Sequence, residues 1–524
     1  MSLTNSHGLK RKLANRHIQM IAIGGVIGTG LFLSSGKTLS GAGPIGAVIC
    51  YSVVGLFVLC VVSSLGEMAS LMPIAGSFNT YASRMVDQAL GFTLGWNYWL
   101  IWTISVPMEV LAASKVTQFW IPGSVMPSWA WNSVFLLILF MLNCLNVRGY
   151  AETEFFLSIV KIVAILAFIV FGFVMAFVTG IKFTNVVGPS AEPFGDNALS
   201  FCSVFITSFF AFGGVEIIGV TAAEAENPSV VVPKAIYGTM FRLAVFNILS
   251  IFVVGLLVPS TDPRLLLTGD EATSPFTIAL ENTGVNFAAS IINAVILIAV
   301  LSAGNSSVYA SPRILMGLAN EGHAPAIFAR TTVSGIPFIG MCVTLIISAA
   351  ILAVGSLKGG VVLGVLMNIT ALSTIFTWLG ILVTHLRFRQ AYIAQGYNLA
   401  DLPYVAPFYP YAQTFTLVVI ICAVVVVGIV QSISGEPIVT VLAQYLGVPV
   451  YILLFVGYKV IKKTRLVPVE SVDFEALKES SSCNSSEFGD IENMVEDDET
   501  LEPSEQSRLS GGFHNQKLPN GDAI

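Results

Sequence analysis

Residues 18–35 read IQMIAIGGVIGTGLFLSS, an apolar stretch without a charge that is interrupted by Gly24, Gly25, Gly28 and Gly30. A glycine in a helix interior costs about 1 kcal/mol relative to alanine. The stretch therefore predicts a membrane helix that breaks near the middle of the bilayer, which lipid tolerates only where the freed backbone faces protein or a water-filled cavity. The N–H groups after such a break and the carbonyls before it suit a ligand that carries a carboxylate and an amine.

The composition is that of a polytopic membrane protein. Of the 524 residues, 55% are hydrophobic and only 11% are charged, and the mean hydropathy is +0.81. These values lie well outside the range of soluble domains. The formal net charge of −6 gives no indication of nucleic-acid binding, because the acids concentrate after Arg465 while the membrane body carries most of the Lys and Arg. We expect the lipid bilayer to surround this chain, and we expect no nucleic-acid partner.

About twelve apolar segments are long enough to cross a bilayer as helices. They lie near residues 17–38, 45–71, 91–120, 130–148, 154–179, 198–223, 235–258, 285–312, 338–356, 361–385, 411–432 and 438–461. Basic residues cluster at alternate ends of these segments, and the clusters Lys10–Arg16 and Lys459–Arg465 fall on one side. Because Lys and Arg favour the cytoplasmic side, both termini are predicted to be cytoplasmic.

A second broken helix is predicted near Phe201–Ala223, where Gly213-Gly214-Val215 repeats the Gly24-Gly25-Val26 of the first span. The two triplets fall in spans one and six. If residues of about 17–180 and 198–385 form inverted repeats, the two breaks meet at one central site. Two alternatives stay open: a glycine pair recurs by chance in apolar sequence, and small residues also permit close helix packing in membranes.

Three regions follow from this pattern. Residues 1–16 form a cytoplasmic N-terminal segment, and residues 17–465 form the membrane domain, in which helices at about 411–461 lie outside the repeats. Residues 466–524 are rich in Ser, Glu and Asp and are predicted to be a disordered cytoplasmic tail. A solvated extension without a role and a regulatory tail that binds cytoplasmic proteins are equally compatible with this composition.

Several motifs carry a family resemblance. They are RHIQMIAIGGVIGTGLFLSSGKTLSGAGP at 16–44, SLGEMASLMP at 64–73, GSFNTYASRMVDQALGFTLGWNYWLIW at 76–102 and EAENP at 224–228. In this order they resemble amino acid permeases of the amino acid–polyamine–organocation superfamily, and the fungal-type branch most closely. The resemblance implies a leucine-transporter-like fold, a five-plus-five inverted repeat with two extra helices. It also implies proton-coupled uptake of free amino acids across the plasma membrane, without a cofactor or a catalysed reaction.

The resemblance also implies a binding site. In the family, backbone amides of the first break hold the substrate carboxylate, and the matching positions here are Gly28, Thr29 and Gly30. Carbonyls of the two breaks would take the α-ammonium group; the matching positions are Val26, Ile27, Phe210, Ala211 and Gly213. Phe210 aligns with an aromatic residue that closes over the substrate in relatives, although an aromatic in a span rich in them is as often simple packing.

Four ionisable residues lie inside apolar spans, where a charge costs roughly 2.5 kcal/mol or more and indicates a functional role. Glu67 is expected to serve helix packing or gating, and Glu109 to face the substrate pocket or stay protonated. Glu216 follows the second break and is expected to cap or neutralise its exposed amides, which is a structural role as easily as a role in transport. By resemblance to proton-coupled relatives, Lys161 replaces the sodium ion of sodium-coupled members and couples transport to protons; a fixed structural cation is the alternative.

Polar residues also mark the middles of spans eight and ten. Their side chains are candidates for substrate selectivity, with helix–helix hydrogen bonding as the equal alternative. They are Asn305, Ser306, Ser307, Ser373 and Thr374.

Two other function classes were weighed against transport. A non-transporting amino acid sensor is the alternative on the same fold, but such sensors carry long N-terminal extensions and only about sixteen residues precede the first span here. An enzyme is disfavoured because the five His residues show no metal or triad arrangement. The preferred amino acid stays open, since an acid near Glu109 also occurs in broad-range relatives.

Overall fold

The computed structural model describes residues 3–4, 20, 26–74, 76–144, 147–178, 198–222, 228–266, 273–332, 335–433 and 445–475. The predictions for Gly24 and Gly25, for most of residues 1–16 and for the tail beyond residue 475 lie outside these ranges. The chain divides into two compact units, Met1–Val472 and Asp473–Ile524. Every helix named below belongs to the first unit.

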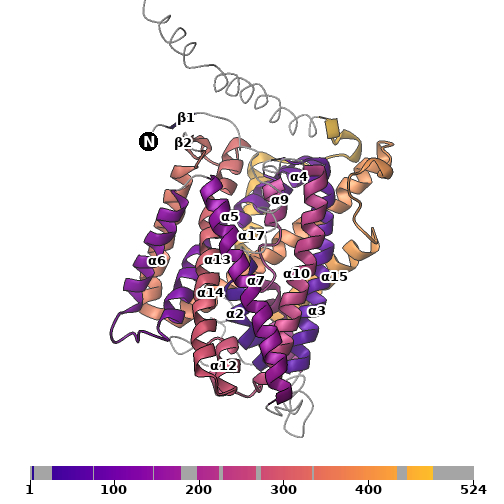
Figure 1. Ribbon diagram of the computed structural model, residues 1–524. Helices are drawn as coiled ribbons and strands as arrows, with labels where there is room; N and C mark the ends of the chain where they lie inside the picture. The colour runs from indigo at the N-terminus through magenta and orange to yellow at the C-terminus, as the bar shows by residue number, and fades with distance from the viewer. Residues whose placement is uncertain are drawn as a thin grey trace, which may run out of the picture. The chain divides into compact units, whose positions relative to one another are not determined.

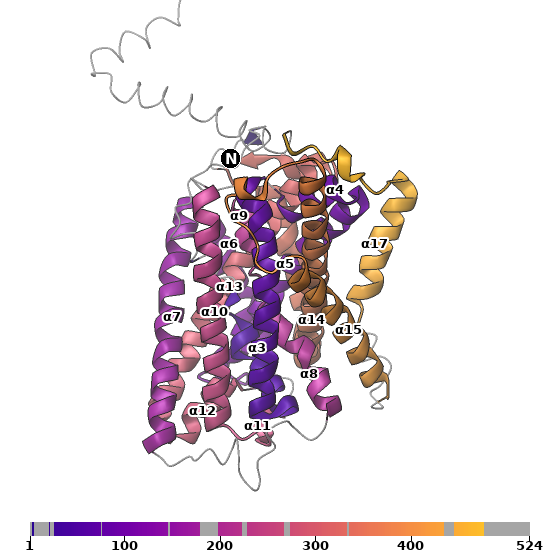
Figure 2. The same ribbon diagram turned by 90° about the vertical axis from the view of Figure 1, so that its right-hand side faces the viewer.

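The first unit is built of helices that run side by side along one common direction (Figures 1 and 2). In chain order they are α2 (Thr29–Phe32), α3 (Ser34–Leu71), α4 (Phe78–Met85), α5 (Gln88–Thr117), α6 (Ser128–Asn143), α7 (Val147–Val178), α8 (Ala198–Phe210), α9 (Ile217–Thr221), α10 (Pro228–Leu257), α11 (Pro263–Leu266), α12 (Pro275–Asn282), α13 (Asn286–Asn320), α14 (Phe338–Ala394), α15 (Tyr411–Ile433) and α17 (Gly447–Lys462). Strands β1 (Leu3–Thr4) and β2 (Thr331–Thr332) pair antiparallel. Short 3-10 turns are η4 (Ala326–Ala329), η5 (Leu399–Asp401) and η6 (Val469–Ser471).

All twelve predicted spans have helical counterparts. Within the described ranges, eight helical stretches are long and apolar enough to cross a membrane, at residues 34–71, 88–117, 152–178, 228–257, 287–320, 338–356, 362–394 and 411–429. The remaining four spans correspond to α2 with the start of α3, to α6, to α8 with α9, and to α17. The all-helical membrane fold expected from the sequence is confirmed.

The boundary between spans one and two lies inside one helical stretch, α3. Two helices meet at a kink within Ser34–Leu71, where Gly43 has φ 68° and ψ 172°, a positive φ that favours glycine. Pro44 follows and has no N–H to continue the helix. The glycine and the proline together therefore make the corner that the sequence placed near residues 38–45.

Both predicted helix breaks occur. In span one, Ile27 and Gly28 leave the helix before α2 begins, and Gly28 has φ −151° and ψ −140°. In span six, α8 ends at Phe210 and α9 begins at Ile217, with a turn between them in which Gly214 has φ 95°. A positive φ of this size strains any residue with a Cβ atom, so glycine fixes where the second break falls.

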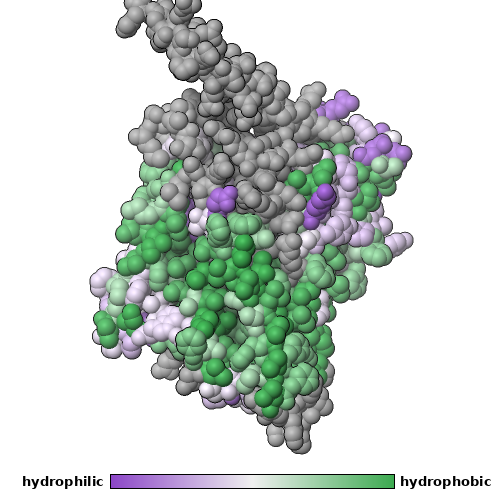
Figure 3. Space-filling view, in the orientation of Figure 1, coloured by the Kyte–Doolittle hydropathy of each residue, from purple (hydrophilic) through white to green (hydrophobic). Residues whose placement is uncertain are grey.

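The outer surface is apolar where a bilayer would touch it. Hydrophobic residues cover the middle of the face shown in Figure 3. On α7, Phe156, Val163, Val170 and Phe177 expose 65%, 59%, 63% and 76% of their area. Exposed apolar side chains over this length of helix indicate contact with lipid.

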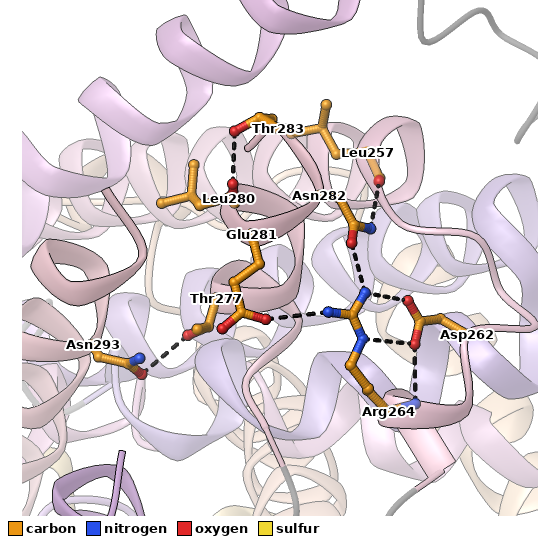
Figure 4. Close-up of polar contacts among 9 residues, drawn as sticks. All are labelled: Leu257, Asp262, Arg264, Thr277, Leu280, Glu281, Asn282, Thr283 and Asn293. Atoms are coloured by element: carbon orange, nitrogen blue, oxygen red, sulfur yellow. Dashed lines mark hydrogen bonds and ion pairs between the residues drawn. The ribbon is translucent and has the colours of Figure 1, made fainter. Parts of the chain in front are cut away.

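The end of the unit that carries α11 and α12 is held by one arginine (Figure 4). Arg264 donates to Asp262 at 2.7 and 3.0 Å, to Glu281 at 3.1 Å and to Asn282 at 2.6 Å. Asn282 in turn donates to the carbonyl of Leu257 at the end of α10, at 3.2 Å. These bonds join α10, α11 and α12, and the Arg264 guanidinium holds the pKa of the Asp262 carboxyl below its ordinary range.

We expect Arg264→Gln to lower the thermal unfolding midpoint in detergent at pH 7 by about 2 °C, for a loss of about 1 kcal/mol. The pKa of Asp262 is lowered in the folded protein, so its contribution is present above the unfolded pKa and disappears as pH falls through the folded pKa. The gap between variant and wild type should therefore narrow as pH falls below about 4. A gap as wide at pH 3 as at pH 7 would contradict this account, and Arg330→Gln, at an exposed arginine, is the control.

Candidate functional site

The two broken helices touch through their main chains. A Cβ atom built on Gly30 would lie 3.0 Å from the Cα of Ala211 and 3.0 Å from the carbonyl oxygen of Phe210. Gly30 lies in α2 directly after the first break, and Ala211 opens the second break directly after α8. Only a residue without a side chain permits this approach, so glycine at position 30 lets the backbone of the two breaks form one surface.

Glu109 lies against the first break. Its Oε1 accepts a hydrogen bond from Thr29 Oγ1 at 2.9 Å, and a Cβ on Gly28 would lie 3.0 Å from the same oxygen. The Glu109 side chain is 5% exposed, and its Oε2 has no hydrogen-bond partner among the described residues. A buried carboxylate oxygen without a donor costs free energy unless it is protonated or meets a ligand.

Helix α14 closes the site from the other side. The Thr374 hydroxyl would lie 3.3 Å from a Cβ on Gly213, so this side chain faces the second break. Within the described ranges, Thr374 Oγ1 and Ser373 Oγ have no hydrogen-bond partner although both are buried. Asn97 of α5 fixes α14 here by donating to the carbonyl of Ser373 at 2.8 Å. The unpaired Thr374 hydroxyl gives the second break a polar side chain available to a ligand, whereas the Ser373 hydroxyl would lie 3.7 Å from a Cβ on Gly447 of α17.

A cavity of ≈ 350 Å³ opens beyond the breaks toward the end that carries α11 and α12. Its volume falls in the range of pockets that bind small molecules. Phe210 lines the cavity, and its carbonyl oxygen would lie 3.0 Å from a Cβ on Gly30, so this residue belongs both to the cavity wall and to the contact between the breaks. The other lining residues come from α3, α5, α8, the α11 region and α14; among them are Leu33, Ser34, Lys37, Lys115, Thr207, Arg264, Met367 and Asn368.

Glu216 ties the second break to α14. Trp378 Nε1 donates to Glu216 Oε2 at 3.1 Å, and both side chains are fully buried. Glu216 occupies the position before α9, yet its side chain makes no capping hydrogen bond to that helix. The observed contact is therefore a bond between helices, and it fits the structural alternative of the sequence interpretation.

Glu67 lies at the opposite end, where α3 ends near α4. Its carboxylate accepts from both Arg389 Nε and Arg389 Nη2, the latter at 2.8 Å, and from the backbone N–H of Ala406 at 2.6 Å. His385 Nε2 lies 3.2 Å from Glu67 Oε2. The Glu67, His385 and Arg389 side chains are at most 3% exposed. A buried charge pair with this many hydrogen bonds locks α3 to α14 and to the segment before α15.

Lys161 lies on α7 and is fully buried. Its Nζ is 3.8 Å from Glu154 Oε1, and the Glu154 side chain is also fully buried. One turn before Lys161, Ser158 donates to the carbonyl of Met20 at 2.9 Å, so this part of α7 lies against the first span. The sequence interpretation missed Glu154, although a spacing of seven residues places it on the same helix face as Lys161.

Asn305 does not face the breaks. Its amide donates to Glu154 Oε2 at 3.3 Å, and its oxygen accepts from Asn143 of α6 at 2.8 Å. Ser307 donates to the carbonyl of Ala303 in its own helix at 2.8 Å. It is Ala303, two residues before Asn305, that lies beside Gly28, 2.8 Å from where its Cβ would be. These contacts match the helix–helix alternative, and a substrate contact of Asn305 stays a prediction.

The site therefore combines parts of five helical regions. The structure brings Gly28, Thr29, Gly30, Glu109, Phe210, Ala211, Gly213 and Thr374 together and buries Val26 and Ile27 beside them. It places Lys161 with Glu154, and puts Glu67 and Glu216 in separate contacts with α14. Within the described ranges no group of three or more His, Cys, Asp or Glu side chains could hold a metal ion.

Comparison with solved structures identifies the class of fold. The manganese transporter of Eremococcus coleocola, in complex with an aromatic bis-isothiourea substituted compound, superposes with a TM-score of 0.52 at 14% identity over 85% of this chain and 94% of that chain. A mutant of that transporter gives 0.54 at 13% identity and the same coverage. At such identity the likeness concerns the fold alone, which is that of a polytopic transporter with a leucine-transporter-like core.

Comparison of sequences identifies the family. The family described as amino acid permease matches residues 17–469. The lysine-specific permease LysP of Lactococcus lactis is 40% identical over 91% of this chain and 95% of its own length. The histidine permease HisP of the same species is 40% identical over 91% and 100%, and the general amino-acid permease GAP2 of Candida albicans is 38% identical over 90% and 82%. The chain belongs to the amino acid permease family, and it is an amino acid transporter of the membrane, not an enzyme.

We expect Gly30→Ala to reduce amino acid uptake by about tenfold or more, because overpacking against main chain costs about 1–3 kcal/mol. The neighbouring backbone of Phe210 and Ala211 cannot yield as a flexible side chain would. The measurement is uptake of radiolabelled L-amino acids by cells that lack their own permeases. Gly457→Ala is the matched control, because no atom lies within 4 Å of a Cβ at that position in α17. Normal uptake by Gly30→Ala would show that the two breaks need not approach so closely.

Proposed function

We propose that this permease carries L-amino acids into the cell together with protons, by alternating access, at the plasma membrane and with both termini in the cytoplasm. The main support is the meeting of two broken helices at Gly30 and Ala211 beside the half-bonded carboxylate of Glu109. Main-chain donors and acceptors that lie next to a buried acid suit a small zwitterion better than an apolar ligand. The relatives' names give no support to a non-transporting sensor.

In this proposal the main chain binds the two charged ends of the substrate. The N–H groups at Gly28, Thr29 and Gly30 open α2, where the positive end of the helix dipole favours a carboxylate. Carbonyls left without helix partners at the breaks take the ammonium group. The substrate side chain then points toward α5 and α14, where Glu109 and Thr374 contact it.

Alternating access uses the difference between the two ends of the unit. The cavity that Phe210 lines admits the substrate from the end that carries α11 and α12. The buried cluster of Glu67, Arg389 and Ala406 closes the opposite end. When Phe210 rotates over the site and α3 separates from α14 at Glu67, access to the site would switch from one end of the unit to the other. The contacts of Glu67 with Arg389 and Ala406 would break and form again in every cycle.

Proton coupling is assigned to Lys161. A buried ammonium group between carboxylates changes its contacts when it loses its proton, which links the proton to the position of α7 against the first span. We expect Lys161→Ala to abolish accumulation driven by an inward proton gradient in proteoliposomes. Lys234→Ala, which removes an exposed lysine on α10, is the control and should accumulate substrate normally. Normal accumulation by Lys161→Ala would refute the assignment and leave Lys161 as a fixed structural cation.

We propose that cationic amino acids are substrates, and they are the first ones to test. Two of the relatives are named for lysine and histidine, and a third is named a general permease. In this chain the free oxygen of Glu109 gives a cationic side chain a partner. We expect Glu109→Gln to reduce lysine uptake about tenfold more than leucine uptake, since a buried charge pair loses one partner. An equal loss for both amino acids, measured at one pH, would assign Glu109 to the shared part of the mechanism instead.

A further inference from the structure

Glu154 has more partners than a simple counter-ion needs. Its Oε1 lies 3.8 Å from Lys161 Nζ and also accepts a short hydrogen bond from Ser302, while its Oε2 accepts from Asn305 at 3.3 Å. Ser302 and Asn305 are three residues apart on α13 and so share one face of that helix. The carboxylate is therefore held by α13 although it belongs to α7.

Asn305 is in turn held in place by α6. Asn143, the last residue of α6, donates both to the Asn305 oxygen at 2.8 Å and to the carbonyl of Leu139 at 3.0 Å. The bond from Asn143 fixes the Asn305 side chain so that its amide nitrogen points at Glu154. All these side chains are buried, and a buried polar network with satisfied members is rigid. The position of the Glu154 carboxylate is thus set by α6 and α13 rather than by α7.

Two carboxylates act on the charge of Lys161 among the described residues. They are Glu154, on its own helix, and Glu109, on α5 beside the first break. The side chains that α13 contributes here, Ser302 and Asn305, are neutral. Of these two acids, Glu109 lies beside the first break and Glu154 is held by α13. Among the described residues, Glu154 is the one within ion-pair distance of Lys161.

We propose that Glu154 is a positioning residue for proton coupling: a counter-charge for Lys161 whose carboxylate is held by α13, so that it fixes where the Lys161 ammonium group lies when that group is protonated. The proton moves between Lys161 and water, while Ser302 and Asn305 hold the Glu154 carboxylate in place. This proposal rests on the proposed proton-coupled transport. It adds the residue that fixes the position of the protonated Lys161 ammonium group.

The test uses purified full-length protein in proteoliposomes and a mixture of ¹⁴C-labelled L-amino acids, so that it does not depend on the preferred substrate. Exchange at equal pH on both sides reports binding and alternating access, and accumulation under an inward proton gradient reports coupling. We expect Glu154→Gln, which keeps the shape but removes the charge and one of the two accepting oxygens, to lose accumulation by about tenfold or more, as for removal of one partner of a buried charge pair. Exchange should fall much less than accumulation.

The pH profile separates positioning from simple packing. An ammonium group without its counter-charge releases its proton more readily, so the pH profile of uptake by Glu154→Gln should move about one unit toward acid. Glu154→Asp keeps the charge and should restore part of the accumulation and of the profile. Glu152→Gln, two residues earlier on a partly exposed position of α7, is the matched control and should behave as wild type. An unchanged profile and full accumulation in Glu154→Gln would overturn the proposal.

A second measurement does not depend on transport. Thermal unfolding midpoints are compared for Glu154→Gln, for Lys161→Gln and for the double variant. If the two side chains are coupled, the double variant should lower the unfolding midpoint by less than the sum of the two single decreases, because neither charge is left unpaired in it. Additive losses would overturn the pairing even if the protein transports amino acids. If the variants show this coupling in unfolding but the wild-type protein neither exchanges nor accumulates amino acids, the proposed transport is refuted instead.

Discussion

The contact between the two helix breaks is the constraint on which the rest of the structure depends. A bilayer offers no hydrogen-bond partners, so main chain freed at Ile27–Gly28 and after Phe210 has to face protein or a polar cavity. The missing side chain at Gly30 lets these two segments pack so closely that a Cβ there would lie only 3.0 Å from the main chain of Phe210 and Ala211, and α5 and α14 close around them with Glu109 and Thr374. The proposed binding of a zwitterion follows from that geometry, since the same unpaired groups that would destabilise a lipid-facing helix would recognise a carboxylate and an amine.

The buried charges explain how such a bundle is both stable and able to move. Three buried carboxylates are each bonded to a helix other than their own: Glu67 of α3 to Arg389 of α14, Glu109 of α5 to Thr29 of α2, and Glu154 of α7 to α13. Buried pairs of this kind add little net stability over apolar packing, but losing one partner is costly. They therefore favour a few defined arrangements of the helices over a continuous range, which is what a carrier with two access states requires.

Sequence reasoning succeeded where the signal is local. The glycines near residue 28 and at 213–214 predicted both breaks, because low helix propensity acts on the residue itself. Isolated ionisable residues in apolar spans were recognisable for the same reason. It failed to notice Glu154, since a glutamate near the end of a span is ordinary in a sequence. It also left Asn305 between two roles, because rotation about the helix axis decides whether a side chain faces the breaks or a neighbouring helix.

The sequence by itself determined that this chain is a polytopic membrane protein, where its helices run, and that two of them break. Composition and glycine content fix these properties residue by residue. The tertiary structure decided which charges meet: Glu67 and Arg389 are 322 residues apart, and Asn305 and Glu154 are 151 apart. No periodicity joins positions so distant along the chain. Their pairing follows only from the packing of helices whose apolar faces are nearly uniform, where a buried polar group must find a partner or forfeit the free energy of its hydration.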